Sequence, residues 1–471
     1  MANTLITEHH NILCKLHYRT LPAQANIPAL SQIFSRLEFC TILGANSSVA
    51  GAGRFSYWAA QPKEIFEFTT KQKYPFDKLQ NILDKYKLSQ DYPFLPDNIF
   101  SGGWIGYFSY ELGRYIEKLT CTTTDDLHMP LIRLCFYDRV IAYDHINKTF
   151  RLFALDIHGD NEKPEKKLDE LERFVIQSQS MKILPPASGC SENKEFSKIL
   201  CNMSREYYLQ SFEKIKKYIY DGEVYQINFS RRFECDFNTD AIGLFNWQNF
   251  YNPSPYSAYI DSGEFKIVSA SPEMFITINN GIISTKPIKG TRPRIINPDK
   301  DYASELLHNE KEQAELNMII DLERNDIAKI CIPGTRKVTQ PRTIETYPTV
   351  FHAVATIAGQ LRDDVTFCDV LKAMFPGGSI TGAPKIRSME IIDETEPTAR
   401  GVYTGSIGFI GINGNTSLNI AIRTIIIKNQ KAYAQTGGGI VADSEPQAEW
   451  QETIIKAKAL MEGIKSIMQH I

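Results

Sequence analysis

Several familiar signals are missing from this sequence of 471 residues. Its nine cysteines form no CxxC pair and no metal-finger spacing, so we expect reduced thiols rather than disulfides or zinc ligands. The net charge is −3, so cationic residues are not in excess, which argues against a nucleic-acid-binding protein. No run approaches the roughly 18 apolar residues of a membrane span, and the start, MANTLITEHH, carries charge and histidine where a signal peptide has an apolar core. These absences predict a cytoplasmic globular protein that binds neither nucleic acid nor a membrane.

The chain does contain mixed helix and strand signals, with one break between them. Paired prolines and small polar residues at 183–196 mark the best boundary, so residues 1–185 and 195–471 are predicted to form an N-terminal and a C-terminal region. A turn at 279–281 (Asn-Asn-Gly) predicts a hairpin, and polar turns divide residues 405–436 into a meander. Because turns this short join antiparallel strands, the predicted fold class is α+β.

Two further segments have clear patterns. Ser204 can cap a helix over 204–220 that has one apolar face. Residues 131–155 hold two apolar-rich runs around a polar turn at 144–148, which predicts another hairpin.

Lys289 stands at a constrained place, between Ile288 and Gly290 in the stretch STKPIKGTRPR (284–294), just past the second strand of a predicted hairpin. An ordinary lysine with a pKa near 10.4 is neutral in roughly one molecule in 2,500 at pH 7. A nucleophilic amine here would need desolvation or neighbouring cations to lower its pKa, and three further cations lie within the same stretch. The alternative is a point-charge ligand for an anion, which needs no pKa shift.

Two predicted helices each carry a Glu-x-x-Glu pair, Glu312 with Glu315 and Glu449 with Glu452. This spacing puts both carboxylates of a pair on one helix face. If the pairs converge, two carboxylates about 4 Å apart repel by about 4 kcal/mol at an effective dielectric near 20, so they need a cation. Hard oxygen ligands without histidine or cysteine favour Mg²⁺. For either pair alone, the alternative is a solvated helix face.

Two glycine-rich stretches precede predicted helices, at 375–394 (FPGGSITGAPKIRSMEIIDE) and 435–444 (QTGGGIVADS). Free N–H groups at such loops can bind an anion, and the alternative for each is a tight turn. Pro384 suits the first turn of its helix. Arg423, in the apparent strand SLNIAIRTIII, is predicted on a small polar strand face, where it could receive a carboxylate or form an internal salt bridge. His352 is, by itself, either a core histidine or a catalytic one.

Together these motifs resemble the chorismate-utilising enzymes, the family of anthranilate synthase component I, aminodeoxychorismate synthase component I, and isochorismate and salicylate synthases. The matching stretches follow the family's order over about 204–465: SASPEMF, PIKGTRPR, AELNMIIDLERNDIAKI, PGGSITGAPKIRSMEIIDE, GSIGFIG, AIRT and TGGGIVADSEPQAEWQET. GGWIGYFSYELGR at 102–114 extends the likeness to nearly the whole chain. The resemblance implies a fold of two packed, mainly antiparallel β-sheets with helices on the outside.

The resemblance also implies roles for individual residues. Lys289 would attack the ring of chorismate, with Glu273 as the acid for the departing hydroxyl, and His352 would line the site. The residues implied to bind the substrate are Arg423, Tyr403, Lys456, Gly437, Gly438, Gly439, Ser379 and Thr381.

The implied cofactor is Mg²⁺, bound to the ring dicarboxylate of the substrate. Glu315 and Glu452 would hold the metal, and Glu312 and Glu449 would support it through water.

Two positions distinguish among the family members. Lys289 replaces the alanine of anthranilate synthases, and Gln226 replaces the water-activating lysine of isochorismate and salicylate synthases. The resemblance therefore implies an aminodeoxychorismate synthase, which makes 4-amino-4-deoxychorismate from chorismate and ammonia on the route to p-aminobenzoate and folate. The alternatives are anthranilate synthase component I and a non-catalytic, anion-binding scaffold.

Two motifs of related proteins are missing. The sequence has no Gly-x-Cys-x-Gly elbow of a glutamine amidotransferase, so we expect ammonia to come from a separate glutaminase subunit. The stretch CTILGANSS, at 40–48, lacks the LLES-like motif with which relatives bind tryptophan.

Overall fold

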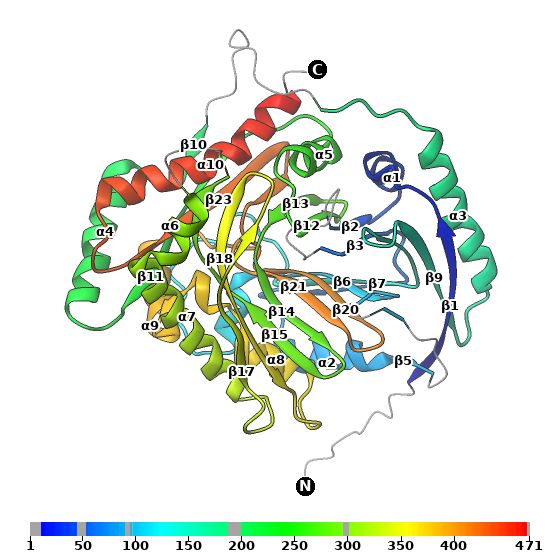
Figure 1. Ribbon diagram of the computed structural model, residues 1–471, viewed down its shortest axis with the longest axis horizontal. Coiled ribbons are helices and arrows are strands. Elements are labelled where there is room, and N and C mark those ends of the chain that lie inside the picture. Colours follow the sequence, from blue (N-terminus) through cyan, green and yellow to red (C-terminus); the bar gives the residue numbers. More distant parts are fainter. Residues whose placement is uncertain are drawn as a thin grey trace.

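Two large β-sheets pack against each other at the centre of the molecule (Figure 1). The computed structural model describes residues 11–44, 53–89, 95–96, 98–186, 199–294 and 301–468. Within these ranges every strand pair is antiparallel apart from β1 with β5. The predicted α+β class, with two mainly antiparallel sheets and helices outside them, is confirmed.

The first sheet has its strands in the order β10 (Leu200–Cys201), β11 (Gln226–Asp236), β23 (Lys431–Ile440), β22 (Thr424–Lys428), β13 (Phe265–Ser271), β12 (Tyr256–Asp261), β2 (Thr41–Leu43), β3 (Phe55–Ala59), β8 (Arg139–Asp144), β9 (Thr149–Ile157), β1 (Ile12–Pro22) and β5 (Tyr86–Leu88), with β19 (Gly382–Ala383) paired to β11.

The second sheet has the order β16 (Ile288–Pro293), β18 (Val350–Gln360), β15 (Ile282–Lys286), β14 (Met274–Asn279), β21 (Thr416–Asn419), β20 (Ser406–Gly411), β6 (Gly103–Phe108), β7 (Ile132–Tyr137) and β4 (Glu64–Phe68), with β17 (Lys337–Thr346) paired to β18. Strands from both sides of the predicted 183–196 boundary therefore lie in both sheets. Residues 187–196 of that segment lie outside the described residues, and the division into two regions stays a prediction.

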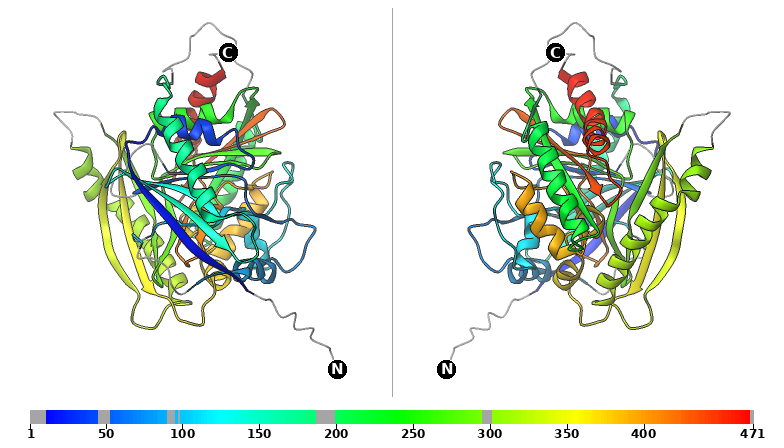
Figure 2. Two further views of the ribbon diagram at one scale, coloured as in Figure 1. Left: turned by 90° about the vertical axis from the view of Figure 1, so that its right-hand side faces the viewer. Right: turned by 90° about the vertical axis from the view of Figure 1, so that its left-hand side faces the viewer.

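The helices surround the two sheets. They are α1 (Ile27–Phe34), α2 (Pro75–Lys85), α3 (Pro164–Ser180), α4 (Arg205–Tyr220), α5 (Ala241–Tyr251), α6 (Tyr302–His308), α7 (Glu310–Ala328), α8 (Phe367–Met374), α9 (Lys385–Thr395) and α10 (Pro446–Met468), with the short 3₁₀ helices η1 (Tyr110–Tyr115) and η2 (Gly378–Ile380). Helices α6 and α7 pack along β16 and β18 and form one flank of the molecule (Figure 2). None of the helices in the described ranges combines the length and apolar character of a membrane span.

The first sheet is buried on both faces. Along β8, Val140 and Ala142 belong to the core between the sheets, whereas Ile141 and Tyr143 belong to the core under helices α1, α3, α5 and α10. Because successive side chains of a strand point to opposite faces, a strand that is buried on both sides is apolar at consecutive positions. This explains the long apolar runs that the sequence shows in this region.

Local sequence signals were confirmed at several positions. Ser204 caps α4, and its side chain accepts a hydrogen bond from the Tyr207 N–H. Asn280 and Gly281 take positive φ values of 49° and 74° in the turn between β14 and β15. Pro384 is the residue before the first turn of α9 rather than a residue of that turn.

Two apolar runs that were predicted as single features cross from one sheet to the other. The hairpin predicted at 131–155 is confirmed for β8 and β9, but β7 lies in the second sheet and the chain crosses at Asp138. The strand predicted around Arg423 is also wrong as a continuous element, because β21 and β22 lie in different sheets and Arg423 has a φ of 50° between them. An apolar run is compatible with either sheet, so its pattern does not show where the chain crosses.

A buried ion pair between Arg400 and Glu396, just after α9, connects separate parts of the fold. Arg400 donates to both oxygens of Glu396, and each side chain is 1% exposed. The Arg400 guanidinium also donates hydrogen bonds to Ile380 O, Asn228 O and Thr404 Oγ1. These contacts connect η2 and β11 with the segment before β20.

We predict that Arg400→Met lowers the free energy of unfolding by roughly 3–5 kcal/mol, because it leaves the charge of Glu396 buried without its partner. Urea denaturation followed by circular dichroism will measure the change. The double variant Glu396→Gln/Arg400→Met should recover part of the loss, since the amide can still accept a hydrogen bond from Ser230. A loss below 1 kcal/mol in Arg400→Met would contradict the prediction.

Candidate functional site around Lys289

Lys289 lies at the start of β16, where carboxylates from distant parts of the chain meet. The charges that act on its amine come from Glu315 on α7, Glu273 just before β14 and Glu452 on α10. Glu273 also accepts a hydrogen bond from the Ile288 N–H at 3.3 Å, which fixes the carboxyl beside the lysine backbone. The structure thus brings the two Glu-x-x-Glu helices to the same lysine, as the sequence hypothesis required.

The surroundings of the Lys289 amine lower its pKa. The largest cause is desolvation, which disfavours the charged form, and the positive charge of Lys456 acts in the same direction. Glu315 and Glu273 oppose the shift. A larger fraction of this amine is therefore neutral at a given pH than for an ordinary lysine, which is what a nucleophilic amine requires.

Glu273 is suited to carry a proton. It is 5% exposed, and burial raises its pKa, with Ser379, the Ile288 N–H and the charge of Lys289 acting in the opposite direction. A carboxyl with a raised pKa can donate a proton at a pH where an ordinary glutamic acid is fully ionised.

The sequence analysis missed Glu323, a second buried carboxyl near Glu273. Its Oε2 accepts a hydrogen bond from the Thr285 hydroxyl at 2.5 Å, and burial raises its pKa to about 7, with the charge of Glu273 among the contributing causes. Glu323 stands where the buried stripe of α7, which includes Leu316 and Ile327, would take an apolar residue. The sequence pattern that could have identified Glu323 is a glutamate that interrupts the apolar stripe of a helix.

Of the four glutamates predicted at the metal, Glu315 acts electrostatically on Lys289, and the other three have polar partners. Glu312 pairs with Arg292 at 2.9 Å through Oε1, while its Oε2 is buried without a hydrogen-bond partner among the described residues. It lies against Gly290, where a Cβ would come within 2.8 Å of Oε2. With a φ of 91°, position 290 favours glycine on conformational grounds as well.

On α10, Glu449 accepts a hydrogen bond from Ser444 at 2.7 Å and Glu452 pairs with Lys456 at 2.6 Å. Burial raises the pKa of Glu449, and the charge of Glu452 raises it further. Within the described ranges, no three acidic, histidine or cysteine side chains already form a metal-binding cluster. The donor set nevertheless fits a hard divalent cation, which would use the oxygens and relieve the repulsion between the carboxylates.

The glycine run at 437–439 continues strand β23 and is not the loop that the sequence predicted. It pairs with residues 228–230 of β11. A Cβ at Gly438 would lie 2.9 Å from Glu449 Oε2 and 3.6 Å from Glu452 Oε1, so the missing side chain allows the carboxylates of α10 to approach the strand. The carbonyl of Gly437 accepts a hydrogen bond from Lys456 at 2.9 Å.

Arg423 lies near His352, which contacts the strand that carries Lys289. The His352 Nδ1 is 2.9 Å from the Thr291 hydroxyl, on the strand that carries Lys289. Burial, with the positive charge of Arg423 as a further cause, lowers the pKa of His352 to about 3, so the imidazole is neutral at physiological pH. Desolvation also lowers the pKa of Arg423, although its side chain reaches solvent. A neutral imidazole beside an exposed guanidinium suits the binding of an anion.

The remaining predicted substrate residues differ in position. Ser379 is close enough to lower the pKa of Glu273, yet its Oγ has no partner at hydrogen-bond geometry among the described residues. The Thr381 hydroxyl donates to the carbonyls of Gly377 and Gly378 within its own loop. Tyr403 is buried beside Arg400, and none of its described contacts reaches Lys289. Roles for Thr381 and Tyr403 at a substrate stay predictions.

Several buried polar atoms around this region lack partners within the described residues. They are Ser379 Oγ, His352 Nε2, Glu312 Oε2, and the side-chain Oε1 and Nε2 of Gln226. Gln226 lies beside the glycine run, since a Cβ at Gly439 would come within 3.1 Å of its Nε2. Because buried polar groups are normally hydrogen-bonded, this concentration is typical of a site that is completed by a polar ligand.

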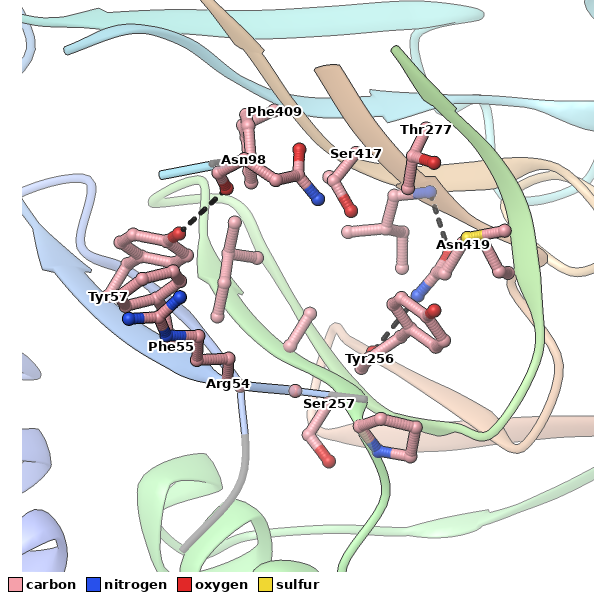
Figure 3. A pocket seen from close by; sticks show the side chains of 18 of the residues that line it. Arg54, Phe55, Tyr57, Asn98, Tyr256, Ser257, Thr277, Phe409, Ser417 and Asn419 are labelled. Carbon is pink, nitrogen blue, oxygen red and sulfur yellow. Dashed lines mark hydrogen bonds between the residues drawn. The ribbon is translucent and has the colours of Figure 1, made fainter. Parts of the chain in front are cut away.

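A separate pocket of about 410 Å³ lies between the two sheets (Figure 3). Its walls include Tyr57 and Phe409, and Asn419 donates to the Tyr256 carbonyl at its edge. Leu43 and Gly44 of the stretch CTILGANSS also line it, and residues 45–48 of that stretch lie outside the described ranges. Among the described residues, none of the predicted site residues lines this pocket.

The chain is similar to known proteins of one family. Residues 47–462 match the family described as chorismate binding enzyme. The chain is 38% identical to anthranilate synthase component 1 of Pseudomonas aeruginosa over 401 residues, which cover 83% of this chain and 80% of that protein. It is 38% identical to aminodeoxychorismate synthase component 1 of Bacillus subtilis over 374 residues, which cover 78% and 77%.

Solved structures show the same relationship. Anthranilate synthase component I from Streptococcus pneumoniae TIGR4 superposes with a TM-score of 0.76 at 31% identity, covering 86% of this chain and 92% of that chain. The menaquinone-specific isochorismate synthase from Escherichia coli superposes with a TM-score of 0.72 at 17% identity, covering 96% and 95%, which shows a shared fold.

Two substitutions should move the pKa of Lys289 in opposite directions. Lys456→Met removes a positive charge that lowers this pKa, so the pKa should rise, whereas Glu315→Gln removes a negative charge that raises it, so the pKa should fall. The pH dependence of Lys289 acetylation by acetic anhydride, followed by peptide mass spectrometry, measures the midpoint. Midpoints that move together, or not at all, would contradict the electrostatic description.

Proposed function

Because this chain belongs to the chorismate binding enzyme family, we propose that it is an aminodeoxychorismate synthase component I, which converts chorismate and ammonia to 4-amino-4-deoxychorismate. The observation that carries the proposal is Lys289, an amine with a lowered pKa beside the buried acid Glu273. Such a pair provides a nucleophile and a proton donor for the displacement of a hydroxyl group.

The proposed reaction has two displacements. In the first, the neutral amine of Lys289 attacks C2 of the chorismate ring, the double bonds shift, and the C4–oxygen bond breaks while Glu273 protonates the departing hydroxyl, which leaves as water. The proton that the attacking nitrogen of Lys289 then loses returns to the Glu273 carboxylate. In the second, ammonia attacks C4, the double bonds shift back and the C2–nitrogen bond breaks, while a proton from the new ammonium group passes to the nitrogen of Lys289, which leaves as a neutral amine. The covalent intermediate divides one difficult displacement into two easier ones.

Binding of the substrate dianion is assigned to cationic and polar side chains of this region. Arg423 and Lys456 supply positive charge, and the unpartnered polar atoms of His352 and Ser379 can complete hydrogen bonds to the ligand. We assign Mg²⁺ to Glu315 and Glu452, with Glu312 and Glu449 as outer supports. When bound, the ion would neutralise the carboxylates of the substrate and of the protein.

The ammonia is proposed to come from a separate glutamine amidotransferase subunit. Related proteins with about this length carry the words component 1 in their names, which fits a chain that works with a second component. The p-aminobenzoate and folate route follows from the proposed product.

Anthranilate synthase component I is the second candidate. The anthranilate synthase component 1 of Pseudomonas aeruginosa and the aminodeoxychorismate synthase component 1 of Bacillus subtilis are each 38% identical to this chain, which favours this candidate as well. The two activities differ in the ring position that receives ammonia, so the products separate them.

Purified protein with chorismate, Mg²⁺ and an ammonium salt should form 4-amino-4-deoxychorismate, detected by liquid chromatography and mass spectrometry. Anthranilate and pyruvate as the main products would favour the second candidate. A folded sample that consumes no chorismate would instead favour the anion-binding scaffold.

Lys289→Ala should abolish the covalent adduct that forms when chorismate and Mg²⁺ are supplied without ammonia. Intact-mass spectrometry should show the wild-type chain with the added mass of chorismate less water. Lys286→Ala is the matched control, because Lys286 lies in the same stretch and pairs with Glu345, so its adduct should persist. An undiminished adduct in Lys289→Ala would remove the nucleophilic role.

Glu315→Gln and Glu452→Gln should each raise the Mg²⁺ concentration for half-maximal activity by about tenfold or more, a loss typical of changes at metal sites. Initial rates across a magnesium titration will measure this. Glu462→Gln, on α10 but paired on the surface with Lys458, should leave the titration unchanged. A shift in Glu462→Gln as large as those in Glu315→Gln and Glu452→Gln would point to a general effect of charge and would contradict the assignment of metal ligands.

A further inference from the structure

Lys216 of α4 is buried against the turn that joins β23 to α10. The residue is 8% exposed, and its hydrogen bonds within the described chain go to three main-chain carbonyls rather than to a carboxylate. The Nζ atom is 3.4 Å from Val441 O and 3.2 Å from Ser444 O, and it also donates to Ala442 O. An ammonium group has three donors, so this arrangement uses its full capacity.

The same turn holds the side chain that contacts Glu449. Ser444 is 6% exposed, and its hydroxyl oxygen accepts a hydrogen bond from the Val441 N–H at 3.1 Å. The hydroxyl donates to Glu449 Oε1 at 2.7 Å. A continuous series of contacts therefore runs from Lys216 through the turn and Ser444 to Glu449.

Lys216 supplies the donor for three carbonyl oxygens of the turn. Three carbonyl oxygens that point to one place repel one another and are costly to bury without a donor. The donor comes from helix α4, which is held in place at both its start and its inner face. Ser204 caps the helix, and the buried face of the helix includes Tyr208, Phe212 and Ile215. Helices α4 and α10 lie side by side in Figure 1, in agreement with their contacts.

We propose that Lys216 is a positioning residue that holds the β23–α10 turn and thereby sets Glu449 for divalent metal binding. The inference rests on the metal role given to Glu449 in the proposed function. Lys216 acts through the turn and makes no contact with reacting atoms. Its removal should therefore weaken metal binding more than it slows the chemical steps at saturating metal.

The test compares Lys216→Met and Ser444→Ala with the control Lys217→Met in the full-length protein. Lys217 is the exposed neighbour of Lys216 on the same helix, so the control makes the same change without touching the turn. The probe is Mn²⁺, a divalent ion whose free concentration is read directly by electron paramagnetic resonance. This measurement does not depend on enzyme activity.

Lys216→Met and Ser444→Ala should raise the Kd for Mn²⁺ by about fivefold or more, and Lys217→Met should stay within twofold of wild type. In activity assays, the half-saturating Mg²⁺ concentration of the first two variants should rise by a similar factor, with kcat at saturating Mg²⁺ within threefold of wild type. If Lys216→Met fails to fold, Ser444→Ala decides, because it keeps the Lys216 contacts to the main chain and removes the Ser444 hydroxyl, with its hydrogen bonds to the Val441 N–H and to Glu449.

Wild-type Mn²⁺ affinity in folded Lys216→Met and Ser444→Ala would overturn the inference while leaving the proposed function intact. The experiment also distinguishes the opposite case, in which the proposed function fails and the inference holds. If wild-type protein consumes no chorismate but its Mn²⁺ affinity falls in both variants, the proposed function fails and the positioning role of Lys216 stands. Failure of the wild-type protein to bind Mn²⁺ would overturn the positioning role.

Discussion

The balance of charge around one amine is the constraint on which the site depends. Desolvation favours the neutral form of Lys289, whereas Glu315 and Glu273 favour its charged form. These groups come from separate elements, so a small change in their placement alters the reactivity of the amine. Two sheets that share a packed core give the rigidity that such placement requires.

The passage of the chain between the two sheets is part of how the site is built. The crossing between β21 and β22 carries Arg423 to His352, which lies beside Thr291 on the strand of Lys289. A residue at such a crossing is released from the alternation of a strand and can take the positive φ that Arg423 shows. The neutral imidazole and the exposed cation therefore occur together because of the topology.

The carboxylates of α10 are placed by backbone and by charge together. Glycine at 438 leaves room for them beside β23, and the contacts of Lys216 and Ser444 fix the turn from which the helix starts. No pattern in the sequence predicts that a lysine of α4 serves this turn, since the two segments are far apart in the chain. The glycine run was likewise predicted as a loop, because a run of glycines is compatible with both a turn and a strand that other groups approach closely.

The sequence by itself determined the α+β class, the cap of α4 at Ser204 and the turn at 279–281, because these depend on the period of apolar residues and on turn chemistry over a few positions. It also identified the kinds of ligand atoms that the site offers. Only the tertiary structure decided that Glu315 and Glu452 act on the same amine and that Glu323 lies buried near Glu273. The physical reason is that desolvation and electrostatic interaction depend on distances in space, and folding sets those distances between groups that local patterns treat separately.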